Sequence, residues 1–311
     1  MMAQTVLVTG AAGFVGTELL EHLRAAGYEP IAAVRHPAML AAGNVPARQL
    51  PAPDAAPGAF PALLQDVDHV VHLAAIAHTS LPGAEAAAAY HAANYRLTAE
   101  LARASATIPG KFVFLSSVRA QAASARDGIL RESDEPRPTD DYGRSKLQAE
   151  MEVRTLLPRK HTILRPVVVY GSGAKGNIAA LARLARLPVP LPFASIKGRR
   201  SLLDRSALCR AILHCLGEGR TDGGTFLVSD RNPVTVADIL TAMREGQGRA
   251  PALFRLPPAL FDVLARATGH SRQWQTMNGD LVASPARLEA TGWAATTDTL
   301  ARIREIAPDL I

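Results

Sequence analysis

A tyrosine and a lysine stand one helical turn apart in the middle of the chain. Tyr142 and Lys146 belong to the segment 141–146 (DYGRSK), where a helix is expected from about residue 142 to 157. Residues four apart share one face of a helix, so the ammonium would lie near the phenol and favour the phenolate. A phenol whose pKa is lowered by a nearby ammonium can act as an acid and as a base near neutral pH. The spacing alone also fits a solvated helix face.

A serine upstream ends an expected strand. The run 111–117 (KFVFLSS) is typical of a buried strand, and Ser117 is its last residue. Ligands gather at the carboxyl ends of parallel strands, so the hydroxyl could polarise the same substrate oxygen that Tyr142 protonates. Ser117, Tyr142 and Lys146 are therefore the candidate catalytic residues.

A glycine-rich turn would hold a cofactor beside them. The run 6–16 (VLVTGAAGFVG) places Gly10, Gly13 and Gly16 at every third position, after a strand and before a helix. Gly10 allows a tight turn, Gly13 lets a pyrophosphate approach the backbone, and Gly16 lets the helix pack close to the sheet. The start of the helix offers free N–H groups and positive dipole to phosphate. An ordinary turn is the alternative, but this context predicts a dinucleotide site.

The surrounding elements alternate between strand and helix. The pattern predicts an α/β fold with a Rossmann-type doubly wound parallel sheet. Residues 45–61 are expected to be irregular. Further strands are expected at 30–35, 67–75, 162–165 and 224–228, and helices at about 14–26, 84–106, 206–217, 235–245, 257–267, 285–290 and 297–306. We expect an NAD(P)-binding domain over 1–170, to which part of 201–230 returns, and a smaller substrate-binding α/β domain over 171–311.

The end of the second strand bears on the choice of cofactor. A carboxylate there binds the ribose 2′-hydroxyl of NAD, whereas a 2′-phosphate needs a cation. The residue is Arg35. NADP(H) is therefore favoured over NAD(H), with an ordinary surface arginine as the alternative.

Composition limits the other classes of function. The chain has 311 residues, of which 48% are hydrophobic, enough for a buried core. The net charge is +6, but the basic residues are scattered and aromatics make up 5%, so we expect no nucleic-acid partner. Cys209 and Cys215 lie six apart in one expected helix and are interpreted as core thiols, with no metal site. No membrane span or leader segment is expected, which favours a cytoplasmic protein.

With these motifs in order, the sequence resembles the extended short-chain dehydrogenases/reductases of the NAD-dependent epimerase/dehydratase family. The matching segments, all within the first 175 residues, are 9–16 (TGAAGFVG), 72–75 (HLAA), Asn94, 115–117 (LSS), Pro138, 142–146 (YGRSK), 164–166 (LRP) and 169–171 (VYG). The resemblance implies a Ser-Tyr-Lys catalytic set at Ser117, Tyr142 and Lys146, with Lys146 also on the nicotinamide ribose. It implies cofactor contacts at Gly10, Gly13, Phe14, Val15, Gly16, Arg35, Leu73, Ala74, Ala75, Asn94, Tyr142, Lys146, Pro166 and Val168.

The resemblance also suggests a substrate. It implies that the smaller domain closes over a nucleotide sugar, with Asn177 and Arg200 on the pyrophosphate. Several stretches are similar to bacterial enzymes that reduce or epimerise C4 of a UDP-sugar for surface polysaccharide. Ser206 departs from the pattern, since an aspartate is usual there.

The residues after Ser117 narrow the reaction. Related dehydratases have an Asp-Glu pair there, whereas this chain has Val118-Arg119, so elimination of water is disfavoured. A 4-ketoreductase and a 4-epimerase remain, and the alternative is a sensor that binds NADP(H) without turnover. The alanine-rich helix at about 86–104 and the Tyr142 helix resemble a family dimer interface, so we expect a homodimer.

Overall fold

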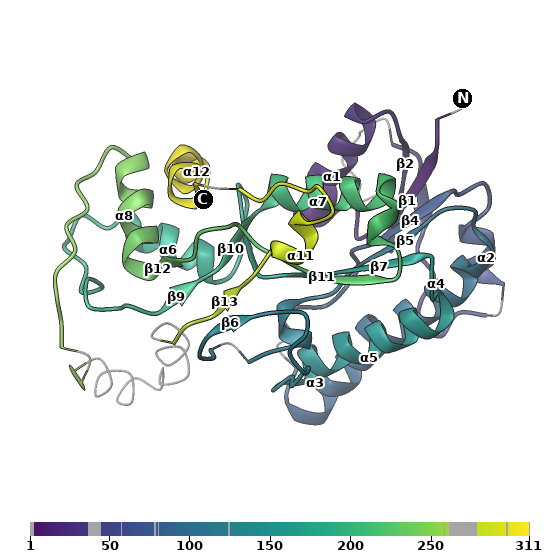
Figure 1. Ribbon diagram of the computed structural model, residues 1–311, viewed down its shortest axis with the longest axis horizontal. Helices are drawn as coiled ribbons and strands as arrows, with labels where there is room; N and C mark the ends of the chain where they lie inside the picture. The colour runs from purple at the N-terminus through teal and green to yellow at the C-terminus, as the bar shows by residue number, and fades with distance from the viewer. Residues whose placement is uncertain are drawn as a thin grey trace.

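A parallel sheet of seven strands organises the larger part of the molecule (Figure 1). The computed structural model describes residues 3–36, 45–56, 58–77, 79, 81–123, 125–257, 259–260, 279–296 and 298–310, so most of the helix expected at 257–267 lies outside the described residues. In spatial order the strands are β11 (Gly224–Val228), β7 (His161–Pro166), β5 (Phe112–Leu115), β4 (His69–His72), β1 (Thr5–Thr9), β2 (Glu29–Val34) and β3 (Ala47–Gln49). Every neighbouring pair is parallel, so the predicted fold class is confirmed.

Helices cover both faces of this sheet because each strand is apolar on both sides. Successive side chains of a strand point to opposite faces. Val6 and Val8 join a core cluster with the helices α1 (Phe14–Ala25) and α7 (Arg205–Gly217). Leu7 joins a second cluster with α2 (Ala59–Leu63), α4 (Leu97–Ala104) and α5 (Asp141–Leu156). Figure 1 shows α1 and α7 on one side of the sheet and α4 and α5 on the other.

The order of the strands indicates where a ligand is expected to bind. From β1 the chain moves outward to β2 and β3, then returns to place β4 on the other side of β1. In an open α/β sheet, the crevice at the carboxyl ends of the strands, where this order reverses, is the ligand site. The turn after Thr9 and the loop after His72 meet at that crevice.

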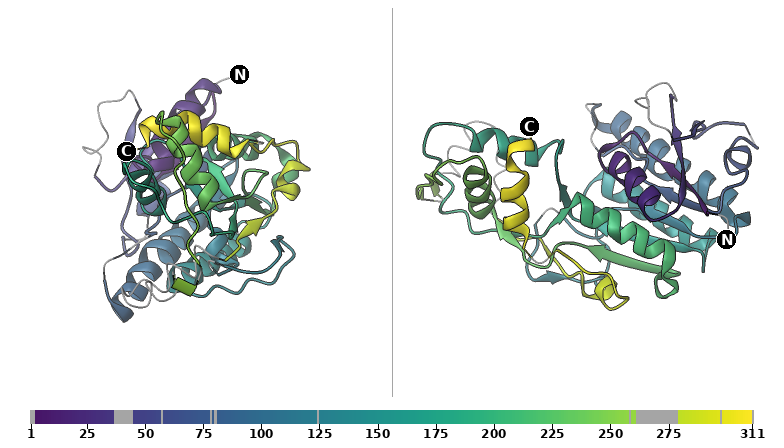
Figure 2. Two further views of the ribbon diagram at one scale, coloured as in Figure 1. Left: turned by 90° about the vertical axis from the view of Figure 1, so that its left-hand side faces the viewer. Right: turned by 90° about the horizontal axis from the view of Figure 1, so that it is seen from above.

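A smaller lobe is built around a separate apolar cluster (Figure 2). Its helices are α6 (Asn177–Ala185), α8 (Val236–Gly246) and α12 (Thr299–Ile306). Two short strand pairs accompany them: β8 (Val168–Tyr170) pairs with β10 (Leu202–Asp204), and β9 (Arg199–Arg200) pairs with β12 (Val234–Thr235). The chain returns to the large sheet through α7 and β11. Residues 281–295 also pack into the first core cluster. This segment contains α11 (Ala286–Glu289) and β13 (Val282–Ala283), and β13 pairs with β6 (Ile129–Leu130). This return of 281–295 was not expected from the sequence.

Two local features differ from the sequence analysis. The segment 45–61, expected to be irregular, contains the edge strand β3 and the start of α2; β3 is only three residues long and carries Arg48 and Gln49, so it shows no apolar pattern. The helix expected at 84–106 consists of α3 (Gly83–Tyr90), a π-helical segment η2 (His91–Arg96), α4 and a 3₁₀ turn η3 (Ser105–Thr107). A π segment inside an α-helix often marks a functional position, and Asn94 lies in it.

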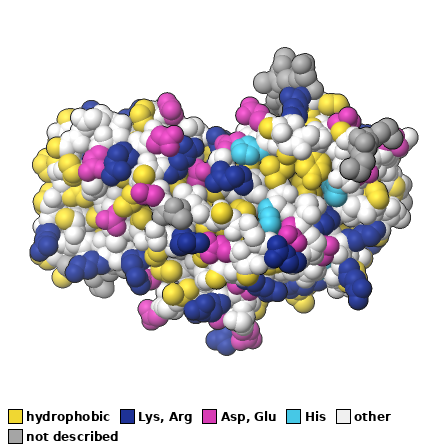
Figure 3. Space-filling model, turned by 45° about the horizontal axis from the view of Figure 1, so that its top comes forward, with side chains coloured by type: hydrophobic (Ala, Val, Ile, Leu, Met, Phe, Trp, Pro, Cys, Tyr) yellow, Lys and Arg dark blue, Asp and Glu magenta, His cyan; other side chains and the backbone are white. Residues whose placement is uncertain are grey.

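Basic and acidic side chains are interspersed on the surface. On the face drawn in Figure 3, lysine and arginine side chains are scattered and interleaved with acidic ones. Within the described parts of the chain, no helix is long and apolar enough to cross a membrane. Cys209 and Cys215 are both buried free thiols on α7, which confirms their interpretation as core residues.

Candidate active site

The glycine turn after β1 is packed so closely that side chains have no room there. Gly10 has φ +69°, and an added Cβ would lie 2.9 Å from the backbone nitrogen of Ala74. On Gly16 a Cβ would lie 2.3 Å from the carbonyl oxygen of Gly10. Gly13 donates from its N–H to the same oxygen at 2.9 Å and is the N-cap residue of α1. The turn therefore has the geometry that a backbone cradle for phosphate requires.

The start of α1 is open to an anion. No side chain among the described residues caps this helix, and its first turn holds no acidic residue. Its orphan N–H groups and positive dipole end therefore face the crevice uncompensated. Phe14 and Val15, in the same turn, are partly buried. These features fit the pyrophosphate of a dinucleotide.

The loop after β4 is held over the glycine turn by Asn94. The buried Asn94 amide accepts from the Ile76 N–H at 2.8 Å and donates to the Ile76 carbonyl at 3.0 Å. It also donates to the Ser145 hydroxyl at 3.1 Å, and Ser145 donates to the carbonyl of Tyr142. Leu73, Ala74 and Ala75 are the intervening loop residues. Asn94 thus ties this loop to the helix that carries Tyr142 and Lys146.

Ser117 and Tyr142 meet at the carboxyl end of β5. Ser117 follows the strand and precedes the turn η4 (Val118–Ala120), and Tyr142 lies in the first turn of α5. Asp140 caps α5 by accepting the N–H of Gly143 at 2.7 Å. Burial raises the pKa of Tyr142, and this effect is opposed by a hydrogen bond from Ser117 and by the positive charge of Arg119.

Lys146 is buried one helical turn after Tyr142 on α5. Its Nζ donates to the carbonyl oxygen of Leu115 at 2.8 Å and lies 4.7 Å from the centre of the Phe114 ring. Burial lowers the pKa of Lys146 to about 7, against the effect of Glu150. The net pKa of Tyr142 is raised by its burial. The lowering expected from Lys146 together with an oxidised nicotinamide stays a prediction. The i, i+4 spacing is present, but Lys146 points to the sheet.

Below Lys146 lies a buried ionic network that the sequence analysis did not assign. Glu150 accepts from Arg165 through both carboxylate oxygens, at 2.8 and 2.5 Å, and from the Ser116 hydroxyl at 2.5 Å. Arg165 also donates to the side chain of Gln121 at 2.8 Å. A bidentate, fully hydrogen-bonded pair of this kind fixes geometry more than it adds stability. Glu150 lies four residues after Lys146, so helical spacing was the available signal.

The remaining predicted cofactor residues lie around the same crevice. Arg35 directly follows β2, and its side chain is exposed at the carboxyl edge of the sheet. Pro166 ends β7, and Val168 begins β8 with its side chain exposed. These positions fit the two ends of an extended dinucleotide, and their roles stay predictions.

The two predicted substrate residues belong to the smaller lobe. Asn177 is exposed at the first turn of α6, directly after Gly176. Arg200 is partly buried in β9 and donates to the carbonyl of Gly279 at 3.1 Å, with Asp280 nearby. Ser206 lies two residues inside the start of α7, where Asp204 caps the helix by accepting the Ala207 N–H.

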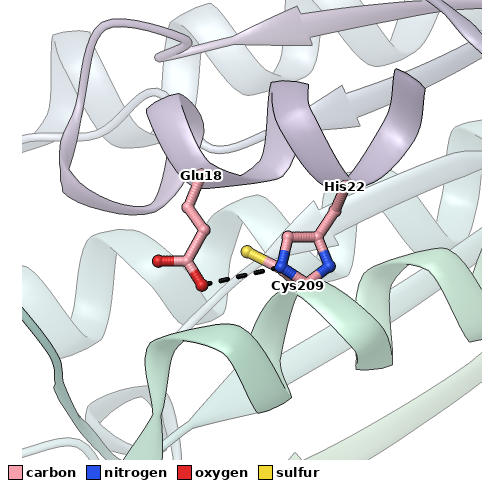
Figure 4. A group of neighbouring side chains, drawn as sticks. All are labelled: Glu18, His22 and Cys209. Carbon is pink, nitrogen blue, oxygen red and sulfur yellow. Dashed lines mark ion pairs between the residues drawn. The ribbon is translucent and has the colours of Figure 1, made fainter. Parts of the chain in front are cut away.

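A polar group links α1 to α7 near the glycine turn. Glu18 and His22 from α1 face Cys209 of α7, and one ligand atom from each lies within 4.8 Å of the others (Figure 4). Glu18 already forms an ion pair with Arg205, and burial raises the pKa of the Cys209 thiol to about 12. The carboxylate is therefore paired and the thiol protonated, which suits a contact between helices better than a metal centre.

A shallow groove opens at the opposite, amino edge of the sheet. Its volume is about 800 Å³, and Thr5, Glu29 and Asp68 are among its lining residues. None of the predicted site residues lines it.

Comparison with known proteins decides the family. The family described as the NAD dependent epimerase/dehydratase family matches residues 6–228, which is more than half of the chain. This chain belongs to that family. The match spans the glycine turn, Ser117, Tyr142 and Lys146, and ends with β11, the last strand of the large sheet.

Individual relatives of this family member cover almost the whole chain. It is 30% identical over 307 residues to a UDP-glucose 4-epimerase of Vibrio cholerae, covering 94% of this chain and 91% of that protein. The UDP-N-acetylglucosamine 4-epimerase of Bacillus cereus matches in structure with a TM-score of 0.77 at 22% identity, over 99% of each chain. A UDP-glucuronic acid 4-epimerase of Bacillus cereus, solved with NAD, gives a TM-score of 0.75 at 19% identity, over 99% of this chain and 98% of that one. The two structures show the shared fold.

Proposed function

We propose that this enzyme is an NAD(P)-dependent 4-epimerase of UDP-sugars. The observation that carries the proposal is the 30% identity to a UDP-glucose 4-epimerase over 94% of the chain. It is supported by the meeting of Ser117 and Tyr142 at the carboxyl end of β5, above the buried Lys146. A 4-ketoreductase would use the same residues and is the second candidate.

The proposed chemistry is a reversible oxidation at C4. The nicotinamide, when bound, supplies reversible hydride acceptance. Tyr142 takes the proton from the C4 hydroxyl as that carbon is oxidised and returns it when the carbon is reduced, so the proton balance is zero. Ser117 donates a hydrogen bond to the same oxygen. Lys146 is assigned to the nicotinamide ribose. Its ammonium has three N–H donors, and the hydrogen bond to the carbonyl oxygen of Leu115 uses only one of them.

The residues present fit a dinucleotide. The cradle around Gly10, Gly13 and Gly16 would hold the pyrophosphate, because an added Cβ at Gly10 or Gly16 would meet backbone atoms. Arg35 would receive a 2′-phosphate, which favours NADP(H) over NAD(H). In the smaller lobe, Asn177 and Arg200 are assigned to the pyrophosphate of the nucleotide sugar.

The proposed working state is a homodimer. Helix α3 buries none of its residues, and Met151 on α5 is an exposed apolar side chain. These surfaces lie on the helical layer where the family resemblance predicts a four-helix interface. Light scattering should give twice the chain mass of 32.9 kDa, and a constant monomer mass over a wide concentration range would contradict this.

One experiment separates the candidate functions. UDP-glucose, UDP-N-acetylglucosamine and UDP-glucuronic acid, and in a separate reaction a UDP-4-keto sugar with NADPH or NADH, are incubated with the enzyme. Products are identified by NMR while absorbance at 340 nm is followed. A 4-epimerase yields the C4 epimer with no net change in reduced cofactor, whereas a ketoreductase consumes it with a 4-keto sugar. Dinucleotide binding without turnover of any nucleotide sugar would contradict both and favour a sensor.

A further inference from the structure

Arg205 bridges the glycine turn and a loop of the smaller lobe. It is the first residue of α7, and its Nη1 donates to the carbonyl oxygen of Phe14 at 3.3 Å and to that of Ser172 at 2.9 Å. Phe14 begins α1, directly after the glycine turn. Ser172 belongs to the loop 171–176, which leads into α6 and Asn177. One side chain thus holds main-chain atoms on the predicted cofactor side and on the predicted substrate side.

The guanidinium of Arg205 is held by further contacts with α1. It lies over the Phe14 ring, with its Cζ 4.7 Å from the ring centre. It also forms an ion pair with Glu18, one helical turn after Phe14. The Arg205 side chain is only 19% exposed, so these contacts are largely shielded from water. The planar guanidinium loses little freedom for each hydrogen bond that it forms, so this side chain makes a rigid link.

The Phe14 ring adds an apolar contact at the same place. It packs against the apolar cluster of the smaller lobe, whose members include Ala174 of the loop and Ile178 of α6. A Cβ added to Gly171 would lie 3.5 Å from Cζ of Phe14 and 3.0 Å from Cβ of Arg205. The start of α1 and the loop 171–176 are therefore packed directly against each other, with Arg205 between them.

The other polar contacts between α1 and α7 lie further along the two helices. His22 contacts the Ser206 hydroxyl at 3.3 Å, and Cys209 faces His22 (Figure 4). In the described structure, the side-chain hydrogen bonds of these three residues stay within α1 and α7. Arg205 is therefore the residue to test for a connection between the glycine turn and the loop.

We infer that Arg205 is a positioning residue that couples the two sides of the site, so that a dinucleotide on the glycine turn and a nucleotide sugar at Asn177 bind with positive cooperativity. The inference rests on the proposed function, which assigns these two ligands to these two places. Phosphate bound at the start of α1 orders Phe14, and Arg205 transmits this order to Ser172. The second ligand then meets a loop that is already ordered and loses less conformational entropy. Because coupling is reciprocal, UDP should strengthen dinucleotide binding by the same factor.

Calorimetry with UDP as the probe measures this coupling. UDP is titrated into the enzyme with and without saturating NADH or NADPH. In the parent, the dinucleotide should tighten UDP binding by about fivefold or more, the lower end of typical coupling. Arg205→Met removes the guanidinium, and the ratio of the two affinities should fall close to one. Arg210→Met removes an exposed arginine further along α7 that donates to Ser206, so it is the matched control and should keep the parent ratio.

A third variant separates coupling from stability. Glu18→Gln removes the ion pair but leaves both carbonyl contacts of Arg205, so it should lower the unfolding temperature and keep the affinity ratio. A purely structural role predicts that the ratio is lost in Glu18→Gln as well. If Arg205→Met does not fold, Arg205→Lys replaces it, because it keeps a charge opposite Glu18 but lacks the planar fork, and its ratio should lie below that of the parent. A parent ratio of one, a ratio that persists without the guanidinium, or an equal loss in Glu18→Gln would overturn the inference.

Hydrogen exchange gives a second readout that needs no nucleotide sugar. Dinucleotide added to the parent should slow exchange of the amides in 171–177. This slowing should disappear in Arg205→Met and remain in Arg210→Met. Failure of the proposed function is distinguishable, because the parent then binds dinucleotide but neither UDP nor a UDP-sugar, while the exchange experiment still tests Arg205. Slowing that persists in Arg205→Met, or that is absent from the parent, would contradict the inference alone.

Discussion

Lys146 donates a hydrogen bond from Nζ to the main-chain oxygen of Leu115, 2.8 Å away, at the end of β5. The ammonium is thus held against the sheet, over the Phe114 ring, and His72 beneath it is also buried. Burial lowers the pKa of His72 to about 3, and the charge of Lys146 contributes in the same direction. Burial below the candidate active site therefore disfavours the charged forms of both His72 and Lys146.

Lys146→Met should change how stability depends on pH. In the folded protein the pKa of Lys146 is about 7, below its ordinary value of 10.5, so between these pH values the unfolded chain binds a proton that the folded protein lacks. This contribution makes the parent more stable as pH rises through that window, by up to ~1.4 kcal/mol per pH unit. Urea unfolding at pH 7 to 10 should show a smaller rise for Lys146→Met. The surface variant Lys175→Met should follow the parent; an unchanged slope for Lys146→Met would refute the assignment.

Tyr142→Phe should abolish most of the catalysis and little of the binding. The change keeps the ring, which packs against Tyr90, and deletes the hydroxyl that moves the proton. Turnover of a UDP-sugar should fall by roughly two to four orders of magnitude, the usual contribution of a general acid and base. Calorimetry should find nearly unchanged dinucleotide binding. Tyr90→Phe is the matched control and should keep turnover close to the parent value; comparable activity in both variants would contradict the role of Tyr142.

Gly16→Ala should impair both cofactor binding and folding. Its Cβ would lie 2.3 Å from the Gly10 oxygen and 2.7 Å from atoms of Ala11, all of them backbone, so the turn must move. Overpacking of this kind costs about 1–3 kcal/mol. Thermal unfolding and dinucleotide titration should both show the loss. Gly217→Ala, at the end of α7 with open space around it, should be nearly neutral, and equal effects of the two changes would contradict the close-packing argument.

Arg35→Asp should weaken binding of NADPH more than binding of NADH. The substitution replaces a cation that can pair with a 2′-phosphate by a carboxylate that can bond a 2′-hydroxyl. Isothermal titration with both cofactors measures the ratio. Arg24→Asp makes the same change in net charge in an exposed residue near the C-terminal end of α1, so it should alter both affinities about equally. Equal losses in Arg35→Asp would remove the argument for NADP(H).

Local patterns in the sequence determined the sheet and the glycine turn. Strand β1, the glycines at every third position and helix α1 are contiguous, so spacing and residue type predicted their conformation. Gly10 has the positive φ that a tight turn needs. The alternation of strand and helix likewise predicted the parallel sheet. Short elements without periodicity, such as β3, gave no such signal, because three residues cannot show an apolar pattern.

Only the tertiary structure decided which charges act on which groups. The pairs Glu150 with Arg165 and Arg119 with Asp140 join residues 15 and 21 positions apart, and their proximity depends on how strands and helices pack. The same packing buries Lys146 and places its ammonium on the carbonyl oxygen of Leu115, a partner that the i, i+4 spacing could not predict. A pKa depends on burial and on neighbouring charge. Neither burial nor neighbouring charge is a property of local sequence, so the direction of the pKa shift of Tyr142 could be obtained only from the tertiary structure.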